Sequence, residues 1–143
     1  MNSNSRRPRQ RRRPDHELIA TFIPAGSRVL DLGCGDGQLL SDLVAHKNCV
    51  VRGIEINEQY VREAIHNGVP VYHGDMLEGM GFYRDGSFDV VVLSQTLQQT
   101  LYPQQVMKEM LRVGNSAVVS FPNFGLLKTR LQLLFSGRMT RHE

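Results

Sequence analysis

The stretch that most constrains the fold is RVLDLGCGDGQLL, residues 28–40, in which an apolar run enters three alternating glycines and a second apolar run follows. Glycine has no Cβ, so the backbone can bend tightly there and a ligand can approach it closely. A glycine-rich turn between a strand and a helix is typical of nucleotide-binding α/β domains. Taken alone, the same glycines also describe a tight strand–helix turn without a ligand.

Apolar runs and helical periodicities alternate along the rest of the chain. Strands are predicted over residues 28–32, 49–56, 69–74, 88–94 and 116–122. Helices are predicted over 14–24, from about 37, and over 58–66, 102–114 and 126–137, with a short helix or loop over 76–87. In the first helix Asp15 is the expected N-cap and Pro24 the stop. The alternation predicts an α/β fold with a Rossmann-like, doubly wound parallel sheet, because parallel strands need helical crossovers that cover both faces.

The charge divides the chain into a basic leader, residues 1–13, and a folded domain, residues 14–143. The leader holds six arginines and no acid, so the net charge of +3 for the chain becomes −3 for the domain. We expect the leader to be disordered and solvated. The alternative is that its arginines bind the phosphates of RNA, DNA or anionic lipid. The leader has no aromatic side chain for stacking on bases, so we do not expect nucleic-acid binding.

The cysteines and the lengths of the apolar runs indicate in which cellular compartment we expect the protein. No apolar run approaches the roughly 20 residues of a membrane-spanning helix, and no apolar signal core follows the basic leader. Cys34 and Cys49 lack the spacing of metal ligands and would make a poor disulfide framework. We therefore expect reduced thiols, no metal site, no contact with membranes and a cytoplasmic location.

Glycines and carboxylates follow the predicted strands, where a doubly wound sheet binds its ligands. The candidate binding residues are Asp31, Gly33, Gly35 and Asp36 after the first strand, Glu55 and Ile56 after the second, Asp75 and Met76 after the third, and Ser94 after the fourth. We expect them to converge on one edge of the sheet. A carboxylate at the position of Glu55 can accept hydrogen bonds from both hydroxyls of a ribose. A solvated strand end is the alternative for this residue taken alone.

The spacing of the glycines restricts the nucleotide. The order G-C-G-D-G differs from the G-x-G-x-x-G of dinucleotide sites, and the chain has no G-x-x-x-x-G-K-[ST] sequence. The carboxylates of Asp31 and Asp36 would repel a pyrophosphate and attract a cation. The pattern therefore favours a ligand with a ribose and a positive charge but no phosphate, a description that fits S-adenosylmethionine.

The segment VLDLGCGDG resembles the first motif of the Rossmann-like class I methyltransferase superfamily, which binds S-adenosylmethionine on a seven-stranded sheet. The resemblance implies that Asp31, Gly33 and Gly35 border the methionine moiety, Glu55 holds the ribose hydroxyls, Asp75 and Met76 frame the adenine, and Ser94 lies on the loop beside the methyl group. A full sheet of this kind has two more strands, commonly an antiparallel hairpin, which the sequence does not show. The prediction is a sheet that lacks its last two strands, in a C-terminally incomplete domain or with its open edge covered by a partner.

Longer segments narrow the resemblance. RPDHELIATFIPAGSRVLDLGCGDGQLL, LSQTLQQT, EMLRVG and VVSFPNFG…RLQLLFSGRM are similar to the MetW family of methionine biosynthesis proteins, over residues 13–139. This resemblance implies a role that supports homoserine O-acyltransferase. The alternative is an active methyltransferase with a small-molecule acceptor, for which no catalytic residue is identified. LSQTLQQT stands where base and glutamine N-methyltransferases carry an Asn/Asp-Pro-Pro-Tyr/Phe motif, so membership of those enzymes is not expected.

Two further features have alternative interpretations. His73 lies after the third strand and is either a general base or, as we expect, a loop histidine near the adenine. The SFPNFG segment, residues 120–125, either forms part of a pocket or partner surface, or packs its two phenylalanines against the next helix.

Overall fold

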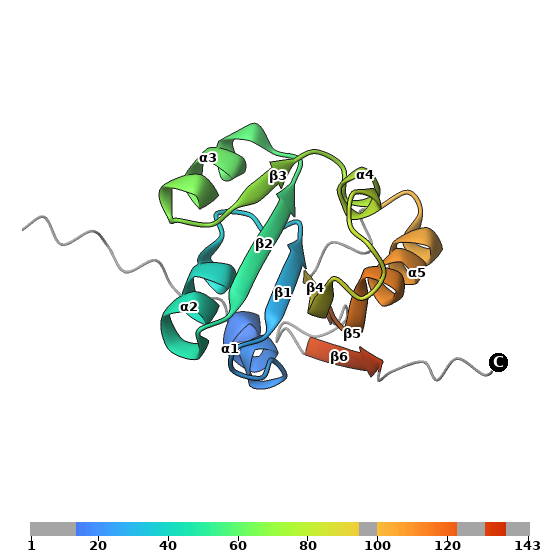
Figure 1. Ribbon diagram of the computed structural model, residues 1–143, viewed down its shortest axis with the longest axis horizontal. Coiled ribbons are helices and arrows are strands. Elements are labelled where there is room, and N and C mark those ends of the chain that lie inside the picture. The colour runs from blue at the N-terminus through green and yellow to red at the C-terminus, as the bar shows by residue number, and fades with distance from the viewer. Residues whose placement is uncertain (1–13, 95–99, 123–130, 137–143) are drawn as a thin grey trace, which may run out of the picture.

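A mixed sheet forms the centre of the fold (Figure 1). The computed structural model describes residues 14–94, 100–122 and 131–136. Within these ranges five parallel strands follow the order β3-β2-β1-β4-β5, and β6 joins β5 in the antiparallel direction. The strands are β1 (Arg28–Leu32), β2 (Val50–Glu55), β3 (Val71–His73), β4 (Phe88–Ser94), β5 (Gly114–Pro122) and β6 (Leu131–Ser136). The predicted Rossmann-like α/β fold is confirmed.

Helices cover both faces of the sheet, as parallel strands require. They are α1 (Pro14–Thr21), α2 (Gln38–Lys47), α3 (Glu58–His66), α4 (Met76–Gly81) and α5 (Pro103–Val113). Successive residues of a strand point to opposite faces, and the core divides accordingly. Val29, Val90 and Val92 pack with α1, α2 and α3, whereas Leu30, Val91 and Leu93 pack with α4 and α5. No described helix has the length and apolar character to cross a membrane.

The first helix begins two residues earlier than the prediction of Asp15 as its N-cap allows. Because α1 starts at Pro14, Asp15 lies inside the first turn and is buried, with 2% of its surface exposed. Proline is favoured at the first position of a helix, where its missing N–H costs no hydrogen bond. Asp15 as N-cap is therefore wrong.

The C-terminal region departs from the predicted helix over residues 126–137. Residues 131–136 form β6, paired antiparallel with β5 from Ala117↔Ser136 to Pro122↔Leu131. The unpaired edge of β5 offers a full row of backbone donors and acceptors, and pairing with such an edge overrides the modest helical preference of a leucine-rich segment. The described part of the sheet thus has one strand beyond the five predicted.

A glycine with positive φ lies where the glycine-rich turn enters α2. Gly37 has φ +77°, and a Cβ at this position would lie 3.0 Å from Val69 Cγ2 and 3.1 Å from Ala64 Cβ. The glycine therefore lets the start of α2 approach α3 and the segment before β3.

Candidate ligand-binding site

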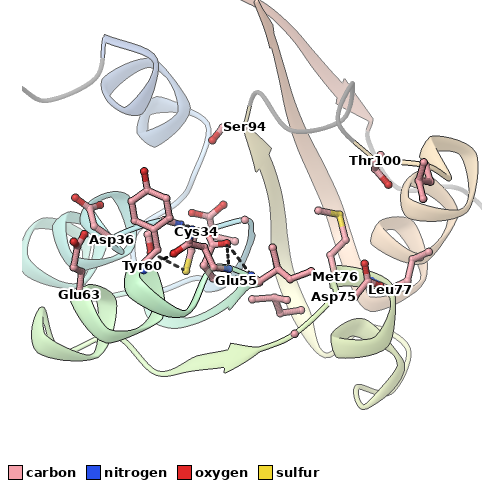
Figure 2. A pocket seen from close by; sticks show the side chains of 18 of the residues that line it. Cys34, Asp36, Glu55, Tyr60, Glu63, Asp75, Met76, Leu77, Ser94 and Thr100 are labelled. Atoms are coloured by element: carbon pink, nitrogen blue, oxygen red, sulfur yellow. Dashed lines mark hydrogen bonds between the residues drawn. The ribbon is translucent and has the colours of Figure 1, made fainter.

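A cavity of about 1000 Å³ opens at the carboxyl ends of β1, β2 and β4. Figure 2 shows Cys34 and Glu55 in the middle of this site, Asp36, Tyr60 and Glu63 on one side, and Asp75, Met76 and Leu77 on the other. The nine residues predicted to bind the ligand all line it: Asp31, Gly33, Gly35, Asp36, Glu55, Ile56, Asp75, Met76 and Ser94. The sheet edge brings together positions that are separated by as many as 63 residues in sequence, from Asp31 to Ser94.

The glycine-rich turn is held against β2 by backbone hydrogen bonds. The N–H groups of Gly33 and Cys34 both donate to the carbonyl of Ile54, at 2.7 and 3.2 Å. Gly33 has φ +68° and Gly35 has φ +57°, in the left-handed region where a side chain is strained. A Cβ on Gly35 would meet no atom within 4 Å. The positive φ angles explain why both positions are glycine, and the open space beside Gly35 leaves room for a ligand to approach the backbone.

Glu55 joins the turn to the start of α3. Its Oε1 accepts a hydrogen bond from the N–H of Gly35 at 2.9 Å. Its Oε2 accepts from the N–H groups of Ile56, at 2.8 Å, and Asn57, at 3.1 Å. A carboxylate has about four acceptor positions, so these three bonds leave one, on Oε1. The geometry therefore leaves room for one ribose hydroxyl, where the sequence suggested two.

Asp75 and Asp36 each support the N-terminus of a helix. Asp75 is the N-cap of α4, and its Oδ2 accepts from the N–H groups of Leu77 and Glu78 at 2.9 and 3.2 Å. Asp36 Oδ1 accepts from the N–H of Gln38, in the first turn of α2, at 3.1 Å. These bonds orient both carboxylates beside the cavity and account for acids at these positions independently of a ligand.

Ser94 is the last residue of β4 and is 7% exposed, so it lies at the strand end rather than on the following loop. Gln95 and most of LSQTLQQT lie outside the described residues, as does the SFPNFG segment beyond Pro122. Their predicted roles stay predictions.

Several lining residues were missed by the sequence reasoning. They are His16 from α1, Tyr60 and Glu63 from α3, and Thr100, Leu101 and Tyr102 before α5. A signal for His16 exists, because it precedes the buried Ile19 by three residues in the same helix, and residues with this spacing lie on one face. Leu101 and Tyr102 are 87% and 57% exposed and carry no periodic signal.

His73 does not line the cavity in the described structure. Its Nε2 lies 3.1 Å from the carbonyl oxygen of Ile56, and the side chain is exposed on the short edge strand β3. The ring contacts the turn between β2 and α3. This position gives His73 a structural contact and does not bring it to the cavity as a base.

The electrostatic character of the cavity is acidic. Among its described lining residues are five carboxylates, Asp31, Asp36, Glu55, Glu63 and Asp75, and no lysine or arginine. Burial raises the pKa of the Cys34 thiol far above its usual range, and the negative charges of Asp31, Glu55 and Asp36 raise it further. Cys34 and Cys49 are both free and buried. The site can therefore hold a cation and disfavours an anion.

Groups of side chains suited to a metal ion are not found among the described residues. The cavity does fit an organic cation with a ribose, because it offers a glycine-rich turn without side chains, one acceptor position on Glu55, and apolar surface from Ile56, Met76 and Leu77. Apolar side chains with a few convergent polar groups are the usual lining of a small-molecule site.

Comparison with solved structures defines the class of protein. The fold is similar to a SAM-dependent methyltransferase from Archaeoglobus fulgidus, with a TM-score of 0.64, 22% identity, and coverage of 76% of this chain and 54% of that one. It is also similar to the [4+2]-cyclase SpnF, with a TM-score of 0.65, 26% identity, and coverage of 74% of this chain and 43% of that one. The chain has the class I methyltransferase fold.

Within that class the sequence identifies the family. The family model described as "Methionine biosynthesis protein MetW" matches residues 13–143, and the chain belongs to this family. It is 36% identical over 135 residues to the bifunctional methionine biosynthesis protein MetXA/MetW of Rhodopirellula baltica, covering 87% of this chain and 21% of that protein. It is 32% identical over 114 residues to the ubiquinone biosynthesis O-methyltransferase of Xanthomonas axonopodis pv. citri, covering 74% and 47%. The chain thus spans less than half the length of these relatives.

Proposed function

We propose that this chain binds S-adenosylmethionine and acts together with homoserine O-acyltransferase in methionine biosynthesis. The observation that carries the partnership is the MetXA/MetW relative, whose name places the two components in one bifunctional protein. Two components that occur in one chain commonly act together. In this proposal the present chain supplies the MetW component, as a cytoplasmic protein.

The cofactor follows from the charge and shape of the cavity. S-adenosylmethionine carries a ribose, an adenine and a sulfonium cation. In our proposal Glu55 accepts from one ribose hydroxyl, Ile56, Asp75, Met76 and Leu77 surround the adenine, and Asp31, Gly33, Gly35, Asp36 and Ser94 surround the methionine moiety. Five carboxylates without a lysine or arginine among the described lining residues support a cationic ligand.

The partnership is tested by mixing this chain with the homoserine O-acyltransferase of the same organism. We expect co-elution on size-exclusion chromatography and higher acyltransferase activity with the chain than without it. The control is a matched amount of an unrelated class I methyltransferase. Separate elution together with unchanged acyltransferase activity would refute the partnership.

Cofactor binding is tested separately by calorimetric titration with S-adenosylmethionine. We expect saturable binding and a rise in Tm, because a ligand that binds only the folded state stabilises it. An absence of heat and of any Tm shift at millimolar ligand would refute this part of the proposal and leave the partnership to its own test.

A second candidate is methyl transfer to a small-molecule acceptor. It is favoured by the convergence of all nine cofactor-side residues on one cavity and by similarity to ubiquinone biosynthesis O-methyltransferases. The cyclase SpnF shares the fold, so the fold does not by itself assign methyl transfer. Incubation with methyl-labelled cofactor and metabolite extract should label a product if this candidate is right.

A further inference from the structure

Three exposed apolar side chains at the mouth of the cavity have no role in the proposed binding of S-adenosylmethionine. Tyr60, Leu101 and Tyr102 all line the cavity, and they are 48%, 87% and 57% exposed. Single exposed apolar side chains are common on protein surfaces, but a group of them around one opening indicates an interaction site. We call these three residues the mouth cluster.

The mouth cluster borders the cavity from two sides. Tyr60 projects from α3, whereas Leu101 and Tyr102 directly precede α5. Figure 2 shows Tyr60 and Thr100, the residue before Leu101, on opposite sides of the cavity. A partner surface that contacts both sides of the mouth cluster therefore covers the opening between them.

Hydrogen bonds of the backbone hold both parts of the mouth cluster in place. The N–H of Tyr60 donates to Oδ1 of Asn57, the N-cap of α3, at 3.2 Å. On the other side, the carbonyl of Tyr102 accepts from the N–H of Val106 in α5 at 3.1 Å. The N–H of Tyr102 donates to Thr100 Oγ1 at 3.4 Å. A backbone that is already fixed lowers the entropy lost when these side chains bind a partner.

The carboxylates beside the mouth cluster restrict the kind of partner. Asp36, Glu63 and Asp75 line the same cavity, and no lysine or arginine is among its described lining residues. These negative charges repel the phosphates of anionic lipids and of nucleic acids. In a symmetric dimer through this surface the same carboxylates would face one another, which disfavours a second copy of the chain. The combination fits a different protein that presents apolar side chains beside lysine or arginine.

We propose that the mouth cluster is the docking surface for the acyltransferase of the proposed function. This inference rests on the proposed function, which supplies the partner, and adds the surface through which the two proteins meet. Tyrosine side chains are common energetic anchors of protein interfaces, and Tyr60 and Tyr102 take that role here. Because the mouth cluster borders the opening on two sides, the docked acyltransferase closes the cavity and slows the release of S-adenosylmethionine.

The experiment measures the Kd for the acyltransferase of the same organism by biolayer interferometry, with the wild-type chain and two double variants. Leu101→Ser/Tyr102→Ser removes apolar surface from the mouth cluster. The matched control, Ile65→Ser/Phe82→Ser, also removes one aliphatic and one aromatic side chain. These two are 58% and 70% exposed and are not among the described residues that line the cavity. We expect the Kd to rise about tenfold or more in the first variant and to stay within about twofold of the wild type in the control.

Equal Kd values for the two double variants, with Tm measurements showing both to be folded, would overturn the inference and leave the partnership intact. A wild-type chain that dimerises alone, and no longer does so in Leu101→Ser/Tyr102→Ser, would overturn it in favour of a second copy. Saturating acyltransferase should also slow the release of labelled S-adenosylmethionine several-fold, and an unchanged release rate would contradict docking at the mouth. An absence of any complex with the wild-type chain would instead refute the proposed partnership, and the docking surface with it.

Discussion

Replacing Glu55 tests whether one carboxylate holds the ligand-binding turn together. The Glu55→Ala variant loses the acceptor of three backbone N–H groups, on Gly35, Ile56 and Asn57. A hydrogen bond to a charged group contributes about 1.5–3 kcal/mol. Water from the cavity can replace part of the lost bonding, so we expect the free energy of unfolding to fall by about 3 kcal/mol in total.

The size of the chain converts this loss into a measurable shift. For a domain of about 150 residues, 1 kcal/mol corresponds to about 3 °C in Tm, so Glu55→Ala should melt about 9 °C below the wild type without any ligand. Glu55→Gln keeps one oxygen but turns an amide N–H₂ toward backbone donors, and we expect a loss of about 2 kcal/mol. Urea denaturation followed by circular dichroism gives both values.

The control is Glu63→Ala, which lines the same cavity and whose carboxylate accepts from the Gln59 side chain at 3.5 Å. Its unfolding free energy should stay within about 0.5 kcal/mol of the wild type. If Glu55→Ala were as stable as Glu63→Ala, Glu55 would not be holding the turn and the structural reasoning would be refuted.

Three further substitutions probe the supports around the site. Arg112→Ala removes bonds to Glu109, to Asp85 and to two carbonyls, so urea denaturation should show a loss of about 2 kcal/mol at pH 7. Hydrogen bonding from Arg112 lowers the pKa of Glu109. The ion pair therefore stabilises the folded state at pH values above the ordinary glutamate pKa, and the difference in unfolding free energy between Arg112→Ala and the wild type should shrink as pH falls below about 4.3. Gly53→Ala places a Cβ 2.5 Å from Cys34 Sγ and should lower Tm by several degrees, with wild-type Tm arguing against this contact. Lys47→Met removes two hydrogen bonds to carbonyls at the end of α1, so hydrogen exchange in α1 should accelerate about tenfold while exchange in β4 stays unchanged.

Much of the fold was predictable because local pattern and tertiary environment agree. The bounds of β1, β4 and α3 match their predictions. An apolar run that is buried on both faces of the sheet and an amphipathic helix with a good N-cap each have a local pattern that agrees with their tertiary surroundings. Residues 131–136 show the opposite case. Their leucines favour a helix, but pairing with the edge of β5 makes the segment a strand. The sequence of the segment alone does not show that this edge is available.

The site residues that directly follow strands could be predicted from the sequence. The site residues that come from α1, α3 and the segment before α5 could not, because only tertiary packing brings these elements to the cavity. Glu55 and Asp75 were found from position alone, because parallel strands end on one edge. Tyr60 and Glu63 lie on α3, away from the strand ends, and only the packing of that helix brings them to the cavity. His73 shows the limit of position as a guide, since its ring turns to the Ile56 carbonyl rather than to the cavity.

The burial of Cys34 in the glycine-rich turn makes the rate of its chemical labelling a measure of local motion. Cys34 is 8% exposed, and its burial beside the carboxylates of Asp31 and Glu55 raises the pKa of its thiol, which disfavours the thiolate that reacts with alkylating reagents. Labelling therefore depends on local motions of the cavity wall that expose the sulfur further to water. The rate of alkylation at Cys34 then measures how often the cavity wall opens, and a bound ligand should slow that rate in proportion to its occupancy.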